Sequence, residues 1–115
     1  MLSKSRRVDT SLFEELMKAG KGANSGSLSA KYLKKDGQKS RFSFVISGKV
    51  EKTAVIRNLF KRRGRSIIKK HIGEIKDGYW VAFFAKKGAE KLSFAKLEAE
   101  ILEILSKTQI IHPVK

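Results

Sequence analysis

Residues 54–66 read AVIRNLFKRRGRS and form the most strongly charged part of the 115-residue chain. Residues 52–70 contain eight Lys and Arg and no Asp or Glu. On a wheel of about 100° per residue, the cations gather on one arc and the apolar side chains on the opposite one. The pattern predicts a helix from Thr53 to about His71, with one face for a core and one for a partner. The polar arc comprises Arg57, Asn58, Lys61, Arg62, Arg65 and Lys69.

The charge on this helix indicates the chemistry of its partner. Like charges four residues apart destabilise an isolated helix by a few tenths of a kcal/mol per pair. A solvated face would mix signs, and this one does not. The whole chain has a net charge of +15 and a pI near 10.3, which favours binding to polyanions. We therefore expect the polar arc to contact nucleic acid phosphates.

Composition sets the class of protein. A chain of this length with 41% hydrophobic residues is expected to form one domain, residues 1–115, with a real core. The absence of cysteine excludes disulfides and thiolate metal sites. No apolar run approaches the ~20 residues that span a bilayer, and no apolar block follows the basic amino terminus. We expect a soluble cytoplasmic protein with no membrane partner, in which residues 1–10 are a loose basic arm and 107–115 a tail.

The amino-terminal part of the domain is expected to start with a helix. Asp9, Thr10 or Ser11 can cap it, apolar residues recur along it at helical spacing, and Gly20 ends it. Residues 22–26, rich in Gly, Asn and Ser, are expected to be a loop.

Alternating apolar and polar residues predict the strands of a small sheet. One strand covers residues 28–32 and another 42–47, with a turn at 34–37 between them. Residues 48–50 either extend the sheet or form a short further strand. The run at 79–85 is apolar on both faces, as in a central strand covered on two sides.

The carboxyl-terminal part is expected to be a helix capped by Ser93. Residues 110–115 are expected to lie outside the core. The element order is α, β, β, with a possible further β, then α, β, α, which is an α+β domain with helices packed on one small sheet. The apolar stripe of the last helix comprises Phe94, Leu97, Ile101, Ile104 and Leu105, and its outer acidic face comprises Glu98, Glu100 and Glu103.

Catalytic chemistry by the chain itself is not expected. Of the two histidines, His71 suits the carboxyl end of the basic helix and His112 lies in the tail. No recognised protease, hydrolase or nucleotide-binding motif occurs, and the carboxylates are scattered without metal-ligand spacing. We therefore expect no catalytic and no metal-binding residues in this chain, and no small-molecule substrate.

Most of the aromatic residues are expected to belong to the core. Tyr32 differs because it alternates with the basic Lys31 and precedes two further lysines. Basic residues interleaved with aromatics are typical of grooves that bind single-stranded nucleic acid.

The basic helix also fits a known signature, A-V-x-R-N-R-hydrophobic-K-R-x-hydrophobic-R-E. The chain thereby resembles the protein subunit of bacterial ribonuclease P. It departs from the signature at three positions. Leu59 replaces the third residue of the Arg-Asn-Arg core, Gly64 stands in a hydrophobic position, and Ser66 replaces an acid. The matching residues are Ala54, Val55, Arg57, Asn58, Lys61, Arg62 and Arg65.

The resemblance extends over nearly the whole chain. Residues 12–20 are similar to the family's first helix and 41–47 to a strand before a Ser-Lys-Lys turn, of which Lys49 keeps one lysine. Residues 77–85 are similar to its last strand. The resemblance implies the order α-β-β-β-α-β-α, a small mixed sheet of the ribosomal protein S5 domain 2-like type, and a left-handed crossover.

The resemblance also implies a function. The chain would be the RNA-binding protein subunit of a ribonucleoprotein endonuclease that removes the 5′ leader of precursor tRNA, with ribonuclease P RNA and precursor tRNA as partners. The RNA subunit would hold the catalytic Mg²⁺ and perform the hydrolysis. The leader groove would lie between the first helix and the sheet, lined by Phe13, Met17, Lys31 and Tyr32. The other RNA-binding residues would be Lys49, Arg57, Asn58, Lys61, Arg62, Arg65 and Lys69.

Three alternatives remain from the residues alone. Another small basic RNA-binding protein, such as a ribosomal protein, would share the charge but have no role in processing. A nuclease in its own right lacks the metal ligands it would need. A cationic protein of the membrane surface would suit the polar face but not the predicted sheet and aromatic core.

Overall fold

The computed structural model describes residues 6–112. Three helices and four strands alternate along the chain in the order α-β-β-β-α-β-α, as the resemblance implies, with two short 3₁₀ turns. The elements are α1 (Thr10–Ala19), β1 (Lys21–Ser25), β2 (Leu28–Lys34), β3 (Arg41–Val45), α2 (Ala54–His71), η2 (Ile72–Glu74), β4 (Tyr79–Ala85), η3 (Ala89–Lys91) and α3 (Phe94–Lys107).

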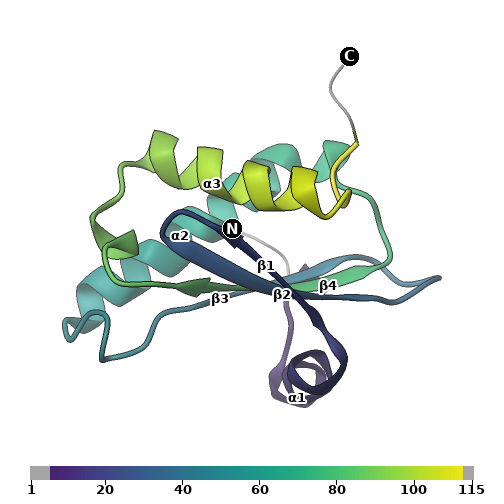
Figure 1. Ribbon diagram of the computed structural model, residues 1–115, viewed down its shortest axis with the longest axis horizontal. Coiled ribbons are helices and arrows are strands. Elements are labelled where there is room, and N and C mark those ends of the chain that lie inside the picture. Colours follow the sequence, from purple (N-terminus) through teal and green to yellow (C-terminus); the bar gives the residue numbers. More distant parts are fainter. Residues whose placement is uncertain (1–5, 113–115) are drawn as a thin grey trace.

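The four strands form one mixed sheet in the order β1-β2-β4-β3. β2 pairs antiparallel with both β1 and β4, whereas β3 and β4 are parallel and are joined through α2. Figure 1 shows α2 and α3 on one face of this sheet and α1 alone on the other. The prediction that residues 79–85 form a central strand covered on both faces is therefore confirmed.

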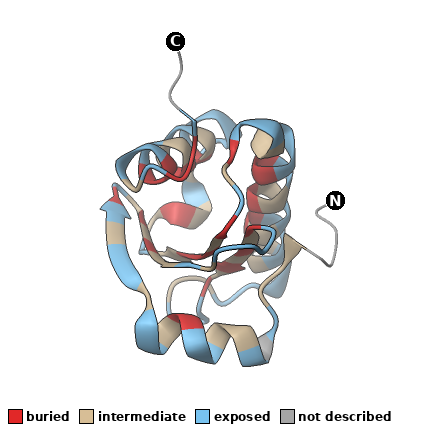
Figure 2. Ribbon diagram, turned by 90° about the vertical axis from the view of Figure 1, so that its right-hand side faces the viewer, coloured by how far each residue is buried: buried red, intermediate tan, exposed pale blue. Residues whose placement is uncertain are grey.

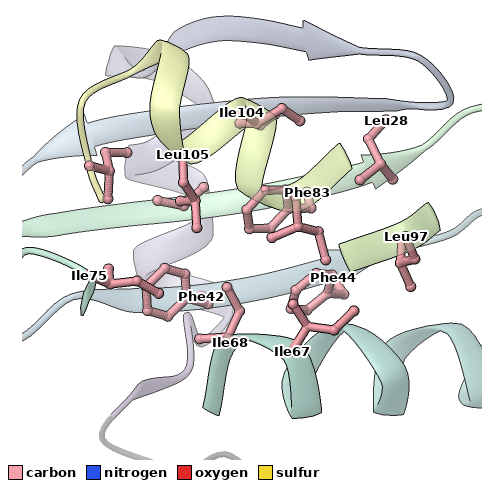
Figure 3. Packing of buried hydrophobic residues seen from close by; sticks show 14 of the residues in the cluster. Leu28, Phe42, Phe44, Ile67, Ile68, Ile75, Phe83, Leu97, Ile104 and Leu105 are labelled. Carbon is pink, nitrogen blue, oxygen red and sulfur yellow. The ribbon is translucent and has the colours of Figure 1, made fainter. Parts of the chain in front are cut away.

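The larger core lies between the sheet and the pair α2 and α3 (Figure 3). Phe44 of β3 stacks on Phe83 of β4, with ring centroids 5.0 Å apart and planes 11° from parallel. Phe60 of α2 meets Phe44 edge-on at 6.3 Å. Gly64 of α2 is buried directly against Phe44, and a Cβ at this position would lie 2.5 Å from two ring carbons. The glycine that departs from the family signature therefore lets α2 approach β3 closely.

The smaller core lies beneath α1. Leu16 is fully buried against Trp80 and Ala82, which point to the α1 face of β4. The outward side of α1 is exposed, as Figure 2 shows. Asp9, one of the three predicted candidates, is the N-cap of α1. Its carboxylate accepts the amide hydrogen of Leu12 at 3.0 Å.

The third strand lies at a different place from the one expected. Residues 22–26 were expected to be a loop, but they form most of β1 and a tight turn in which Gly26 has φ 48°. Residues 48–50, the alternative strand, form a turn. β1 lacks an apolar alternation, and contacts distant in sequence hold it: Ser25 donates to Glu103, and Lys107 Nζ donates to the carbonyl oxygen of Asn24 at 2.8 Å.

Both ends of the described chain are better anchored than expected. Ile110 and Ile111 are buried in the larger core, and Ile111 forms a β-bridge with Ile75. The tail therefore belongs to the core up to this point, and residues 113–115 lie outside the described part. At the other end, Arg6 pairs with Asp77 at 2.7 Å and the amide of Val8 donates to Phe42, so residues 6–8 are not loose.

The two faces of the last helix, α3, also differ from the prediction. Four residues of its apolar stripe are fully buried, but Phe94 is 39% exposed because it lies at the first turn, beyond the edge of the core. None of the three acids is simply solvated, since Glu103 accepts the hydrogen bond from Ser25. Glu98 accepts hydrogen bonds from His71 and Lys70 of α2, and Glu100 accepts the amide hydrogen of Ser27 at 2.6 Å.

Candidate RNA-binding surface

The polar arc of α2 divides into two rows that differ in exposure. The inner row consists of Arg57, Lys61 and Arg65, each half-buried. The outer row consists of Asn58, Arg62 and Lys69, each exposed. The inner row turns toward β3, because Lys61 and Arg65 line a groove of about 330 Å³ whose other wall includes β3. The predicted single face therefore has a more buried side next to β3 and a more exposed side.

This groove combines cations with an aromatic side chain. Lys61 and Arg65 border it from α2, Phe13 from α1, and residues of β3 form the other wall. The N-cap residue Asp9 also lines it, as an acid beside the two cations. Partial burial lowers the pKa of Arg65 below its usual value, and the charge of Arg7 adds to the effect. A guanidinium keeps its charge at neutral pH in either case. A partly desolvated cation interacts more strongly with an anion such as a phosphate than a fully exposed one does.

Arg57 also has a structural role at the start of α2. Its Nη1 donates to the carbonyl oxygens of Glu51, at 3.1 Å, and Lys52, at 3.3 Å. A Cβ on Gly48 would lie 3.4 Å from the same nitrogen. The turn that carries the exposed Lys49 therefore packs beside Arg57, so Lys49 extends the cationic surface of α2 past its amino end.

Three of the four candidate leader-binding residues come together on the α1 face of the sheet. Met17 and Lys31 line a second groove of about 420 Å³ together with Phe84. Lys31 Nζ donates to the carbonyl oxygen of Met17 at 3.0 Å. Phe13 lies against Phe84, with ring centroids 6.1 Å apart. This aromatic pair joins the second groove to the first.

Tyr32 does not belong to this groove. In β2, Lys31 is paired with Ala82 and faces α1, whereas Tyr32 is paired with Val81 and packs against the larger core on the opposite face. The prediction that places Tyr32 beside Lys31 in one groove is wrong, because successive residues of a strand point to opposite faces of a sheet.

Sequence reasoning missed the residue at the centre of the groove, Phe84. The strand register places Asn24, Ser29, Phe84 and Val45 directly opposite one another, so that they form one row across all four strands. Phe84 is half-buried, and the polar Asn24 and Ser29 extend the row toward β1. The run at 79–85 is apolar throughout, so only the register and the position of α1 single out Phe84.

The titratable cluster at the end of α2 links elements together. His71 pairs through Nε2 with Glu98 at 2.8 Å and through Nδ1 with Glu74 at 3.2 Å. The hydrogen bonds from His71 and Lys70 lower the pKa of Glu98.

Among residues 6–112, no group of three or more His, Asp or Glu side chains is arranged to hold a metal ion. None of the helices in the same range is long and apolar enough to cross a membrane.

A family model described as Ribonuclease P matches residues 1–109. The chain belongs to the ribonuclease P protein family. The protein component of Syntrophomonas wolfei is 31% identical over 108 residues, which are 93% of this chain and 90% of the relative. That of a Pseudanabaena species is 34% identical over 73 residues, 64% of this chain and 63% of the relative. That of Helicobacter acinonychis is 41% identical over 71 residues, 62% of this chain and 46% of the relative. The chain thus spans less than two thirds of the length of the last two.

Solved structures share the fold of this chain. The ribonuclease P protein of Staphylococcus aureus superposes with a TM-score of 0.83 at 19% identity, covering 95% of this chain and 100% of the other. That of Thermotoga maritima gives a TM-score of 0.76 at 22% identity, covering 93% and 96%. The expected α+β architecture, with its α-β-β-β-α-β-α order, is therefore confirmed.

Proposed function

We propose that this chain is the RNA-binding protein component of the ribonuclease P ribonucleoprotein, and that it assists removal of the 5′ leader from precursor tRNA. Family membership supports the assignment to this ribonucleoprotein. The observation that carries the leader role is the continuous path from the inner row of α2 through the Phe13–Phe84 pair to the groove under α1.

The path offers what a single strand of RNA needs. Cations at one end, Lys61 and Arg65, bind the phosphates, and the exposed parts of the Phe13 and Phe84 rings offer a surface on which an unpaired base stacks. Ser29 and Asn24 then supply hydrogen-bonding groups to the strand beyond the aromatic pair. This assignment keeps Phe13, Met17 and Lys31 as leader contacts and replaces Tyr32 by Phe84.

The outer row lies next to the inner row on α2 but is more exposed. Arg62 and Lys69, with the amide of Asn58, are open to a second partner. The exposed Lys49 lies beside Arg57, at the amino end of the same helix. We assign these residues to phosphates of the ribonuclease P RNA. One helix would then contact both the catalytic RNA and its substrate.

The chemistry is assigned to the RNA subunit, together with Mg²⁺. The described side chains of this chain form no ligand set for the ion, and no step of the proposal passes through a metal on the protein. The protein's part is electrostatic and positional, since it neutralises phosphates and orients the leader.

Reconstitution tests the proposal. The purified chain is added to a bacterial ribonuclease P RNA at low Mg²⁺, and cleavage of precursor tRNA at the 5′ end of the mature sequence is measured. The chain should stimulate cleavage, and Lys61→Ala/Arg65→Ala should lower affinity for precursor tRNA more than for mature tRNA. The control Lys34→Ala/Lys39→Ala also removes two charges, at exposed positions near the β2–β3 turn, and should leave this difference unchanged.

Two results would contradict the proposal. The absence of any stimulation would remove the processing role. Equal affinity of the unsubstituted protein for precursor and mature tRNA would instead favour a basic RNA-binding protein of the ribosomal kind.

A further inference from the structure

Three large apolar side chains are exposed in the described part of the chain, and they lie at the same end of the molecule. Val55 is 72% exposed, Leu59 38% and Phe94 39%. Val55 and Leu59 lie one turn apart on α2, and Phe94 opens α3. Figure 1 shows the first turns of α2 near η3 and the start of α3. We call these three residues the apolar patch.

A hydrogen bond joins α2 to Leu92, the residue that follows η3, and both of its ends are close in sequence to the patch. Arg63 Nη1 donates to the carbonyl oxygen of Leu92 at 3.3 Å. Leu59 precedes Arg63 by one helical turn, and Phe94 follows Leu92 by two residues. Leu59 and Phe94 therefore flank this link from the two elements that it joins.

The surroundings of the patch are cationic. Lys52, Arg62, Lys91 and Lys96 are exposed beside it along the chain. The nearby acid Glu51 accepts the amide hydrogen of Thr53, and Glu90 that of Gly88. Together with the net charge of +15, this arrangement repels a second copy of the chain and attracts a polyanion.

We propose that the apolar patch receives an unpaired nucleotide of an RNA. Its base packs on Phe94 and Leu59, while the neighbouring lysines and Arg62 bind the flanking phosphates. A paired A-form helix hides its bases in a deep, narrow groove, whereas bulges and loops present splayed bases to aromatic and apolar side chains. The patch therefore distinguishes unpaired from paired RNA, which phosphate contacts alone cannot do.

This site is separate from the leader path. Leu59 lies about 120–160° around the helical wheel from Arg65 and Lys61, so the patch and the inner row occupy different sides of α2. Leu59 stands where the family signature has a cation, so the patch is a feature of this chain. The inference rests on the proposed function only in requiring that α2 binds RNA.

The test compares two RNA hairpins of equal length and charge, one with a single unpaired purine in its stem and one fully paired. The unsubstituted protein should prefer the bulged hairpin. Phe94→Ala and Leu59→Ala should each reduce that preference by roughly fivefold to tenfold, as loss of one base contact predicts. The dependence of affinity on salt should not change, because neither substitution removes a charge.

Two further variants sharpen the comparison. Leu59→Arg should bind both hairpins more tightly and steepen the salt dependence by about 0.7–0.9, but it should not keep the preference for the bulge. Leu102→Ala, an apolar truncation on another side of α3, is the control and should keep that preference. Thermal unfolding of each variant confirms that the fold is intact.

The outcomes separate this inference from the proposed function. Equal binding of both hairpins by the unsubstituted protein, or unchanged preference in Phe94→Ala and Leu59→Ala, would overturn the nucleotide site. The nucleotide site would also be overturned if the protein sedimented as a dimer, and if Phe94→Ala dissociated this dimer without changing RNA binding. If Lys61→Ala/Arg65→Ala still flattens the salt dependence in these cases, the RNA-binding role of α2 stands. If that variant also has no effect, the proposed function fails as well.

Discussion

The closest approach between α2 and the sheet gives a prediction about stability. In Gly64→Ala the new Cβ would lie 2.5 Å from two ring carbons of Phe44 and 2.8 Å from a third, about 1 Å inside normal carbon contact distance. The ring cannot easily retreat, because Phe83 stacks on one side of it and Phe60 meets it edge-on. The overlap must therefore be relieved by shifting α2 or by leaving a favourable rotamer.

The magnitude follows from two opposed effects. Overpacking of this kind typically costs about 1–3 kcal/mol, whereas alanine gains about 1 kcal/mol over glycine inside a helix. We expect Gly64→Ala to lower the free energy of unfolding by about 0–2 kcal/mol, measured as a shift of the urea midpoint at constant slope.

Two matched variants test the reasoning. A Cβ on Gly73 would meet nothing within 4 Å, so Gly73→Ala should be neutral or slightly stabilising. Phe44→Leu removes part of the ring, and adding Gly64→Ala to it should cost less than in the unsubstituted protein, with a coupling energy of about 1 kcal/mol. A gain in stability from Gly64→Ala alone would refute the argument that Phe44 requires a glycine.

Three other predictions concern function and pH. Phe84→Ala should weaken binding of precursor tRNA by about 1–3 kcal/mol and leave mature tRNA nearly unaffected, whereas Tyr32→Ala should not discriminate between them in the same binding assay. Hydrogen bonds from Arg6 and from His71 lower the pKa of Asp77 and Glu98 respectively. The stability that these two carboxylates contribute should be complete above their usual pKa values near 4 and should be lost as the pH falls through their lowered pKa values. Glu98→Gln should therefore reduce the loss of stability at acidic pH, measured by unfolding at a series of pH values. The pure chain, incubated with precursor tRNA and Mg²⁺, should leave the RNA intact on a gel.

The helices and the central strand could be predicted because their signals are local. The charge and apolar spacing of residues 54–66 define α2, and the apolar run at 79–85 defines β4. β1 could not be predicted, because its five residues have no alternation and its pairing depends on backbone contacts with β2. The burial of Ile110 likewise depends on residues distant in sequence, since its carbonyl oxygen accepts the amide hydrogen of Lys76.

The candidate site likewise combines features that local sequence predicts with features that depend on long-range packing. The cations of α2 were identified from the sequence, but their separation into an inner and an outer row depends on where β3 packs. Phe13, Met17 and Lys31 lie together on the α1 face of the sheet, whereas the position of Tyr32 required the strand register. A rule as simple as the alternation of β2 excludes Lys31 and Tyr32 from one groove, so that error could have been avoided without the structure.

The departures from the family signature have physical consequences that connect stability with RNA binding. At Gly64 the missing side chain brings α2 against Phe44, which lines the same groove as Lys61 and Arg65. An alanine there should therefore widen the groove as it weakens the fold. At Leu59 the missing charge has a different consequence, because an exposed apolar side chain can contact a base but adds nothing to the binding of phosphates. The salt dependence of RNA binding therefore distinguishes the two positions. Gly64→Ala should change the affinity for precursor tRNA with little change in the salt dependence. Leu59→Arg should make the salt dependence steeper.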